Sequence, residues 1–274
     1  MMIKEHNMAN AKEITNRMRR NIVRMIYEAK SGHPGGSLSI VEILYTLYFE
    51  ILDKDVNNTG KEEDKFVLSK GHAAPGLYSV LCEKGYIKEE ELWTLRKTNS
   101  ELQGHPDLKH TKGVDVNTGS LGQGASIAVG LALAKKYKKD NHKVYALLGD
   151  GELQEGLVWE ASMAAGHYKL DNLTFIIDNN GLQIDGANDE VMTVNPIEDK
   201  FKAFNFETYV VKDGNNVDKL IEAFNKPHNG KPKAIICKTT KGKGVSFMEN
   251  KSGWHGKAPN EEEFNMAMAE LGGV

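Results

Sequence analysis

Short carboxylate and amide side chains follow two strand-like segments of this chain. Asp150 follows an apolar run at residues 144–148, and Asn180 follows a second apolar run at residues 173–177. Neither run alternates with polar residues, which is typical of strands buried on both faces of a parallel sheet. The residues between the runs have the spacing of an amphipathic helix. The segment therefore predicts a strand–helix–strand unit.

This unit would bring the two polar side chains to one place. The carboxyl ends of parallel strands lie at one edge of a sheet, where ligands bind, so we expect Asp150 and Asn180 side by side. Gly151 would let a phosphate approach the start of a helix, where free N–H groups favour an anion. A carboxylate, an amide oxygen and diphosphate oxygens suit Mg²⁺. A Gly-Asp-Gly sequence alone is more often a turn, and the Asn after the matched strand is what favours a metal-bridged diphosphate site.

Four histidines lie in loop-like segments rich in glycine or proline. They are His33 in SGHPGG, His72 in KGHAAPG, His105 in GHPD and His255 in GWHGKAP. Any one of them alone is more often a surface or capped histidine than a catalytic one. Because loops at one edge of a sheet can converge, we expect all four to reach the same ligand.

These segments together resemble a known family. SGHPGGSLS, LSKGHAAPGLYSVL, GHP, NTGSLGQGASIAVGLA, LLGDGELQEGLVWEA and WHGKAP are similar, in order and over nearly the whole chain, to the diphosphate-binding domain of transketolases. Those enzymes depend on thiamine diphosphate. The Gly-Asp-Gly and Asn pattern marks only a thiamine-diphosphate enzyme, whereas the histidine loops are specific to transketolase and its close relatives.

The resemblance implies a role for individual residues. The side chains of Asp150 and Asn180 and the backbone oxygen of Leu182 would bind Mg²⁺, or Ca²⁺ or Mn²⁺ in its place. Four residues would act on the reacting ketose, namely His33, His105, His255 and Lys257, the last by helping to close a Gly-rich loop. The residues implied to contact the cofactor are His72, Gly119, Ser120, Leu121, Gly149, Gly151, Glu155 and Asn180. Ser120 stands where many relatives have proline, and Glu155 is expected at a subunit interface.

The resemblance also implies a missing half. In full-length transketolases a glutamate of a second, pyrimidine-binding domain activates the cofactor, and a third domain follows. Residues 1–274 resemble only the first domain, so the chain is similar to the N-terminal subunit of a split transketolase. We expect a separate C-terminal subunit to complete a heterotetramer that transfers a two-carbon unit from a ketose or its phosphate to an aldose or its phosphate. The chain alone would be inactive.

Two alternatives stay open at this point. One is another thiamine-diphosphate enzyme, similar to 1-deoxyxylulose-5-phosphate synthase or to the α-subunit of a 2-oxo-acid dehydrogenase. The other is a non-catalytic scaffold of the same fold, which the presence of Asp150, Asn180 and all four histidines disfavours. The donor and acceptor sugars, and whether the route is the pentose phosphate pathway or a specialised one, cannot be predicted from these residues.

Composition narrows the class of protein. The 274 residues are 40% hydrophobic and 27% charged. The net charge of −3 does not favour binding to a nucleic acid or to an anionic membrane surface. Cys82 and Cys237 lack metal-ligand spacing. The first residues lack the apolar stretch of a signal peptide, so we expect a cytoplasmic protein.

Alternating strand-like and helix-like segments predict one doubly wound α/β domain, with a mainly parallel sheet and helices on both faces. The small-residue segments 125–134 and 161–166 are expected to pack against other helices, which favours self-association.

Residues 31–37 are expected to form a Gly/Pro break. We expect helices at residues 10–30, 39–52, 77–83, 89–97, 125–137, 217–224 and 261–271, and further strands at residues 65–69, 206–211 and 233–239.

Overall fold

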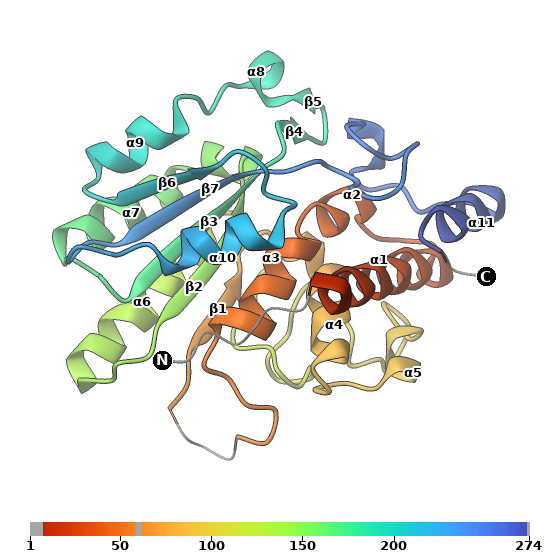
Figure 1. Cartoon of the computed structure of the whole chain (residues 1–274), viewed down its shortest axis with the longest axis horizontal. Helices are drawn as coiled ribbons and strands as arrows, with labels where there is room; N and C mark the ends of the chain where they lie inside the picture. Colours follow the sequence, from red (N-terminus) through yellow and green to blue (C-terminus); the bar gives the residue numbers. More distant parts are fainter. Residues whose placement is uncertain (1–7, 59–61, 273–274) are drawn as a thin grey trace.

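The computed structural model describes residues 8–58 and 62–272, so the segment that bears on a signal peptide lies partly outside it. Its main sheet has five strands in the order β1-β2-β3-β7-β6, and every neighbouring pair is parallel (Figure 1). The predicted parallel sheet is therefore confirmed. The strands are β1 (Lys65–Leu68), β2 (Val144–Gly149), β3 (Leu173–Asn179), β6 (Glu207–Val211) and β7 (Lys233–Lys238).

Helices cover both faces of this sheet, as the doubly wound fold requires (Figure 1). Leu147 and Ile176 belong to one buried cluster, whereas Ala146 and Phe175 belong to the other, because successive strand residues point to opposite faces. The first cluster takes in residues of α1 (Met8–Ala29), α3 (Val41–Thr46), α4 (Ala74–Glu83) and α10 (Val217–Asn225). The second takes in residues of α6 (Gln123–Lys138), α7 (Gly156–His167) and α9 (Ile197–Ala203).

The remaining elements are short, apart from the C-terminal helix. A two-stranded antiparallel hairpin, β4 (Leu182–Gln183) and β5 (Gly186–Ala187), follows β3 and leads into α8 (Asn188–Val191). The short helices are α2 (Pro34–Leu38) and α5 (Glu89–Leu92), and the C-terminal helix is α11 (Glu261–Glu270). Turns of 3₁₀ helix occupy Gly71–Ala73, Gly151–Gln154 and Ser252–Trp254, and a π-helical turn occupies Leu47–Ile51.

Two local predictions are wrong, and a third is confirmed only in part. The expected Gly/Pro break contains α2, because Pro34 is placed in the first turn and burial of all five residues outweighs the poor helix propensity of glycine. The expected helix at 39–52 is helical from Val41 to Ile51, but its last part, Leu47–Ile51, is π-helical. The expected helix at 89–97 ends at Leu92, and the positive φ of Arg96 is incompatible with a right-handed helix. The elements α8, α9, β4 and β5 were not predicted.

The two small-residue helices pack against each other as well as against the sheet. Ala128 and Ala132 of α6 are fully buried, which explains why small residues were needed there. The outward side of the pair carries exposed apolar groups, since Tyr137 is 90% and Met163 61% exposed.

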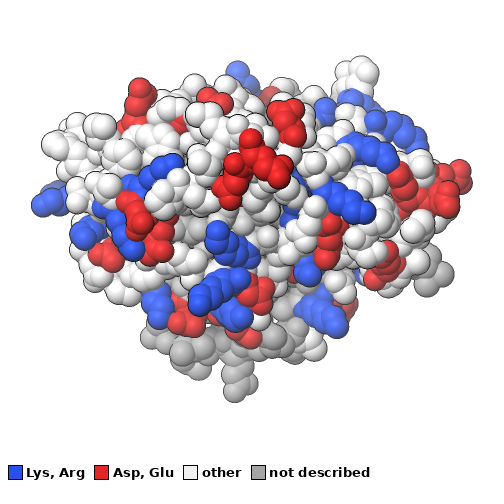
Figure 2. Space-filling view, turned by 90° about the horizontal axis from the view of Figure 1, so that it is seen from above, with Lys and Arg blue, Asp and Glu red and all other residues white. Residues whose placement is uncertain are grey.

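Charges are mixed on the surface of the molecule. On the face seen from above in Figure 2, Lys and Arg side chains are interspersed with Asp and Glu. On this face, therefore, there is no basic field for a nucleic acid, in agreement with the small net charge. Within residues 8–58 and 62–272, none of the helices has the length and hydropathy to cross a bilayer.

Candidate functional site

Four strand ends meet where the sequence predicted a ligand site. Gly149 at the end of β2 is paired with Asp178 of β3, so Asp150 lies beside the residues that close β3. The chain around this edge encloses a cavity of about 180 Å³. Its lining includes Lys70 after β1, Asp150 after β2, Asn180 after β3 and Lys241 in the loop after β7.

The expected metal ligands share this cavity. Asp150 is 2% exposed, and its carboxylate accepts hydrogen bonds from Asn179 Nδ2 at 2.9 Å and from the Gly181 N–H at 2.6 Å. The Leu182 N–H donates to Asn180 Oδ1 at 3.1 Å. Burial and then the charge of Asp178 raise the pKa of Asp150, so a cation beside it would stabilise its charged form. The Asp150 carboxylate is thus hydrogen-bonded to the turn after β3 that carries Asn180 and Leu182.

Two lysines that sequence reasoning missed supply positive charge. Lys70 Nζ forms an ion pair with Asp178 Oδ2 at 2.6 Å, and both side chains are almost fully buried. Burial by itself raises the pKa of Asp178, but the Lys70 ammonium together with hydrogen bonds from Thr239 and Ser39 outweighs it, and the pKa lies below its usual value. Lys241 Nζ donates to the Leu182 carbonyl oxygen at 3.0 Å, and burial with the charge of Lys70 lowers the pKa of Lys241 to about 8. A diphosphate would find two ammonium groups here.

Three of the four histidines form a compact cluster. The ring centroids of His33, His72 and His255 lie 5.1 to 5.4 Å from one another. Burial is the main cause that lowers their pKa values, to about 4 for His33 and about 3 for His255, and well below the usual value for His72. The cluster is therefore neutral at neutral pH, so each imidazole has one N–H to donate and one nitrogen to accept.

His105 packs against the loop at residues 118–124. Gly119 has φ of +157°, and a Cβ built on it would lie 3.2 Å from His105 Cγ, so only glycine lets the two segments come this close. Ser120 and Leu121 follow on the exposed part of the loop, and Leu121 lines the cavity. Buried Glu152 fixes the loop, because it accepts the N–H groups of Gly122 at 2.8 Å and Gly149 at 3.0 Å.

Two predicted residues stand apart from the cluster. Lys257 Nζ pairs with Glu263 and lies 4.3 Å from the centre of the Trp254 ring, with about half of its side chain exposed. Glu155 borders the cavity at the start of α7 and is exposed, which fits a contact with another subunit. The Lys257 ammonium group is engaged by Glu263 and Trp254 in this structure.

The residues present fit Mg²⁺ and a diphosphate. One carboxylate, one amide and one carbonyl oxygen are hard oxygen ligands, and Mg²⁺ usually takes its remaining ligands from phosphate and water. A Cβ on Gly36 would lie 3.4 Å from Lys70 Nζ, and one on Gly151 would lie 3.2 Å from Gln183 Cβ, so both glycines keep the cavity open. Among residues 8–58 and 62–272, no group of three or more His, Cys, Asp or Glu side chains could hold a metal ion, which excludes a zinc-type cluster there.

Comparison with known proteins identifies the family. Residues 10–273 match the family model described as transketolase, thiamine diphosphate binding domain. The chain belongs to this family. It is 43% identical over 257 residues to an apulose-4-phosphate transketolase subunit of Actinobacillus succinogenes, covering 93% of each chain. It is 45% identical over 243 residues to 6-deoxy-6-sulfo-D-fructose transketolase subunit SqwG of a Clostridium species, covering 88% of each.

Full-length transketolases match over a smaller share of their length. Human transketolase is 44% identical over 251 residues, which are 90% of this chain and 39% of the human protein. The transketolase structure from Campylobacter jejuni superposes with a TM-score of 0.91 at 34% identity, covering 98% of this chain and 43% of that one. The chain thus spans about two fifths of these enzymes but nearly all of the two relatives named as subunits.

Proposed function

We propose that this chain is the diphosphate-binding, N-terminal subunit of a split transketolase that transfers a two-carbon ketol unit from a ketose or its phosphate to an aldose or its phosphate. The observation that carries the proposal is the difference in coverage, because the chain spans nearly the whole of relatives named as subunits and about two fifths of full-length transketolases. Oxygen, ammonium and imidazole groups converge at this site. They support a role in catalysis, because a scaffold protein would need none of these groups.

Thiamine diphosphate, when bound, would supply the carbanion chemistry of ketol transfer. This chain would hold the metal through Asp150, Asn180 and Leu182, and Lys70 and Lys241 would offset the charge of the diphosphate. Their burial strengthens these interactions, because the local dielectric constant is lower than that of water.

The histidines would bind the ketose. Neutral His33 and His255 would each donate one N–H to a sugar hydroxyl, and His105 would donate where negative charge develops at the carbonyl oxygen. Fixing several hydroxyls at once also orients the bond that breaks. Lys257 would contribute only if its loop moved towards the cluster.

The partner would be a C-terminal subunit that carries the pyrimidine-binding and third domains. The outward side of α6 and α7, with exposed Tyr137 and Met163, is the surface we propose for contact with further subunits in a heterotetramer. The sugar cannot be carried over, because the two named relatives differ in the sugar that their names give, apulose 4-phosphate in one and 6-deoxy-6-sulfo-D-fructose in the other. Cytoplasmic localisation stays part of the proposal.

Ketol transfer from a panel of ketose donors, with this chain, the partner and their mixture assayed separately, tests the proposal. We expect turnover only in the mixture, dependent on Mg²⁺ and thiamine diphosphate. A mixture that forms a complex and transfers no ketol from any donor would contradict the transketolase assignment.

A further inference from the structure

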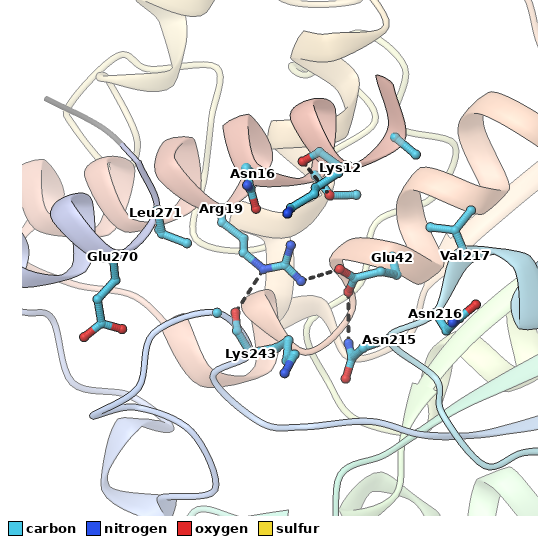
Figure 3. Close-up of a pocket in the computed structure, with 13 residues that line it drawn as sticks. Lys12, Asn16, Arg19, Glu42, Asn215, Asn216, Val217, Lys243, Glu270 and Leu271 are labelled. Carbon is cyan, nitrogen blue, oxygen red and sulfur yellow. Dashed lines mark hydrogen bonds and ion pairs between the residues drawn. The ribbon is translucent and has the colours of Figure 1, made fainter. Parts of the chain in front are cut away.

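The backbone of the loop that contains Lys241 is hydrogen-bonded to a buried network of side chains. Figure 3 shows this network at the wall of a cavity of about 440 Å³ that is separate from the ligand site. Arg19 of α1 and Glu42 of α3 form an ion pair there, and they are 5% and 7% exposed. Asn215, in the turn before α10, donates to Glu42 Oε2 at 2.9 Å. These contacts join three elements that are distant in the sequence.

Both ends of the network bind the backbone on either side of Lys241. Arg19 Nε donates to the carbonyl oxygen of Lys243 at 3.0 Å (Figure 3). Asn215 Oδ1 accepts the N–H of Thr240 at 2.9 Å. Glu42 joins the two ends, because its two carboxylate oxygens accept from Arg19 and Asn215 respectively. The loop is therefore hydrogen-bonded to the network at residue 240, just before Lys241, and at residue 243, two residues after it.

These hydrogen bonds fix the position of the Lys241 ammonium group. Lys241 is 2% exposed, and its Nζ contacts the Leu182 carbonyl oxygen and His255 Nδ1. The loop around it contains Gly242 and Gly244, both with positive φ, so its backbone has little intrinsic preference for this shape. Hydrogen bonds from outside the loop therefore fix it, and besides the network the Gly242 N–H donates to the Gly35 carbonyl oxygen at 3.0 Å.

We propose that Arg19, Glu42 and Asn215 are positioning residues for Lys241, which hold its ammonium group where a diphosphate binds. The role of Lys241 rests on the proposed function, whereas the anchoring of the loop does not. Loss of Asn215 or of the Glu42 charge should free the loop, lower the effective charge at the cofactor site and leave the parallel sheet intact.

Two variants and a matched control test the anchoring on the full chain without cofactor. Asn215→Ala and Glu42→Gln should accelerate amide hydrogen exchange about tenfold or more at residues 240–250 and leave β2 and β3 unchanged. Asn216→Ala is the control, because Asn216 lines the same cavity but caps α10 by accepting from the Lys219 N–H. It should lower the melting temperature without affecting the loop. Equal loop exchange in all three variants, or unchanged exchange in Asn215→Ala, would overturn the proposal.

A double-mutant cycle tests whether the network acts through Lys241. Asn215→Ala should weaken binding of Mg²⁺–thiamine diphosphate to the assembled enzyme about tenfold, as expected for loss of one charge-assisted contact. In a Lys241→Met background the same substitution should have no further effect. Additive losses would show that Asn215 does not act through Lys241. If the wild-type protein bound no thiamine diphosphate, the proposed function would fail while the exchange experiment still decided the anchoring.

Discussion

Replacing Lys70 by Met isolates the buried ion pair beneath the ligand site. The substitution keeps the length and apolar stem of the side chain but removes the ammonium 2.6 Å from Asp178 Oδ2. Breaking a buried pair by removing one partner usually costs about 3–5 kcal/mol, because the other charge stays buried. Asp178 retains hydrogen bonds from Ser39, Asn180 and Thr239, so we expect the lower end, about 3 kcal/mol. This corresponds to a decrease in melting temperature of roughly 6–12 °C.

Urea unfolding of the ligand-free chain, followed by circular dichroism, measures this change as a lower midpoint with an unchanged slope. The double variant with Lys70→Met and Asp178→Asn should recover at least about 1 kcal/mol, because the uncompensated charge is gone. A loss below about 1 kcal/mol in the single variant, or a double variant no more stable than the single one, would refute the reasoning.

Three further predictions concern the site. Asp150→Ala should abolish activity that depends on Mg²⁺ and thiamine diphosphate in the presence of the partner, while the circular dichroism spectrum stays unchanged; full activity would remove Asp150 from the metal ligands. His105→Ala should lower kcat/KM for the ketose about 10²-fold, as for loss of an oxyanion donor, and change cofactor affinity less; the reverse pattern would contradict its substrate role. Because the pKa of His33 is about 4 in the folded chain and 6.5 in its ordinary state, the unfolded chain binds this proton first as pH falls. The free energy of unfolding should therefore decrease as the pH is lowered from about 6.5 to 4, and it should decrease less steeply in His33→Asn. If the free energy of unfolding had the same slope against pH in both proteins, His33 would not titrate in this way.

The strand ends could be predicted because their signals are local. Uninterrupted apolar runs before Asp150 and Asn180 indicate buried parallel strands, and parallel strands necessarily end on one edge. Glycine and proline next to His33, His72 and His255 place these histidines in loops, and the structure does bring the three rings together.

The other residues could not be found in this way, because their roles depend on contacts between distant segments. Lys70 lies within the KGHAAPG segment, but only the fold shows that it pairs with Asp178, 108 residues later. Asn215 lies in a turn that has no recognisable motif, and it donates to the carboxylate of Glu42, which is 173 residues away in the sequence. Short helices such as α9 are missed for a related reason, since only Ile197 and Phe201 of its seven residues are buried and the pattern is too brief.

The most direct test of the central claim is a titration of this chain against a fixed amount of its C-terminal partner, with ketol transfer from the cognate donor as the readout at saturating Mg²⁺ and thiamine diphosphate. We expect no turnover by either chain alone and a rate that rises linearly to a plateau at one copy of this chain per partner. Turnover by this chain alone at a rate normal for an enzyme would contradict this claim.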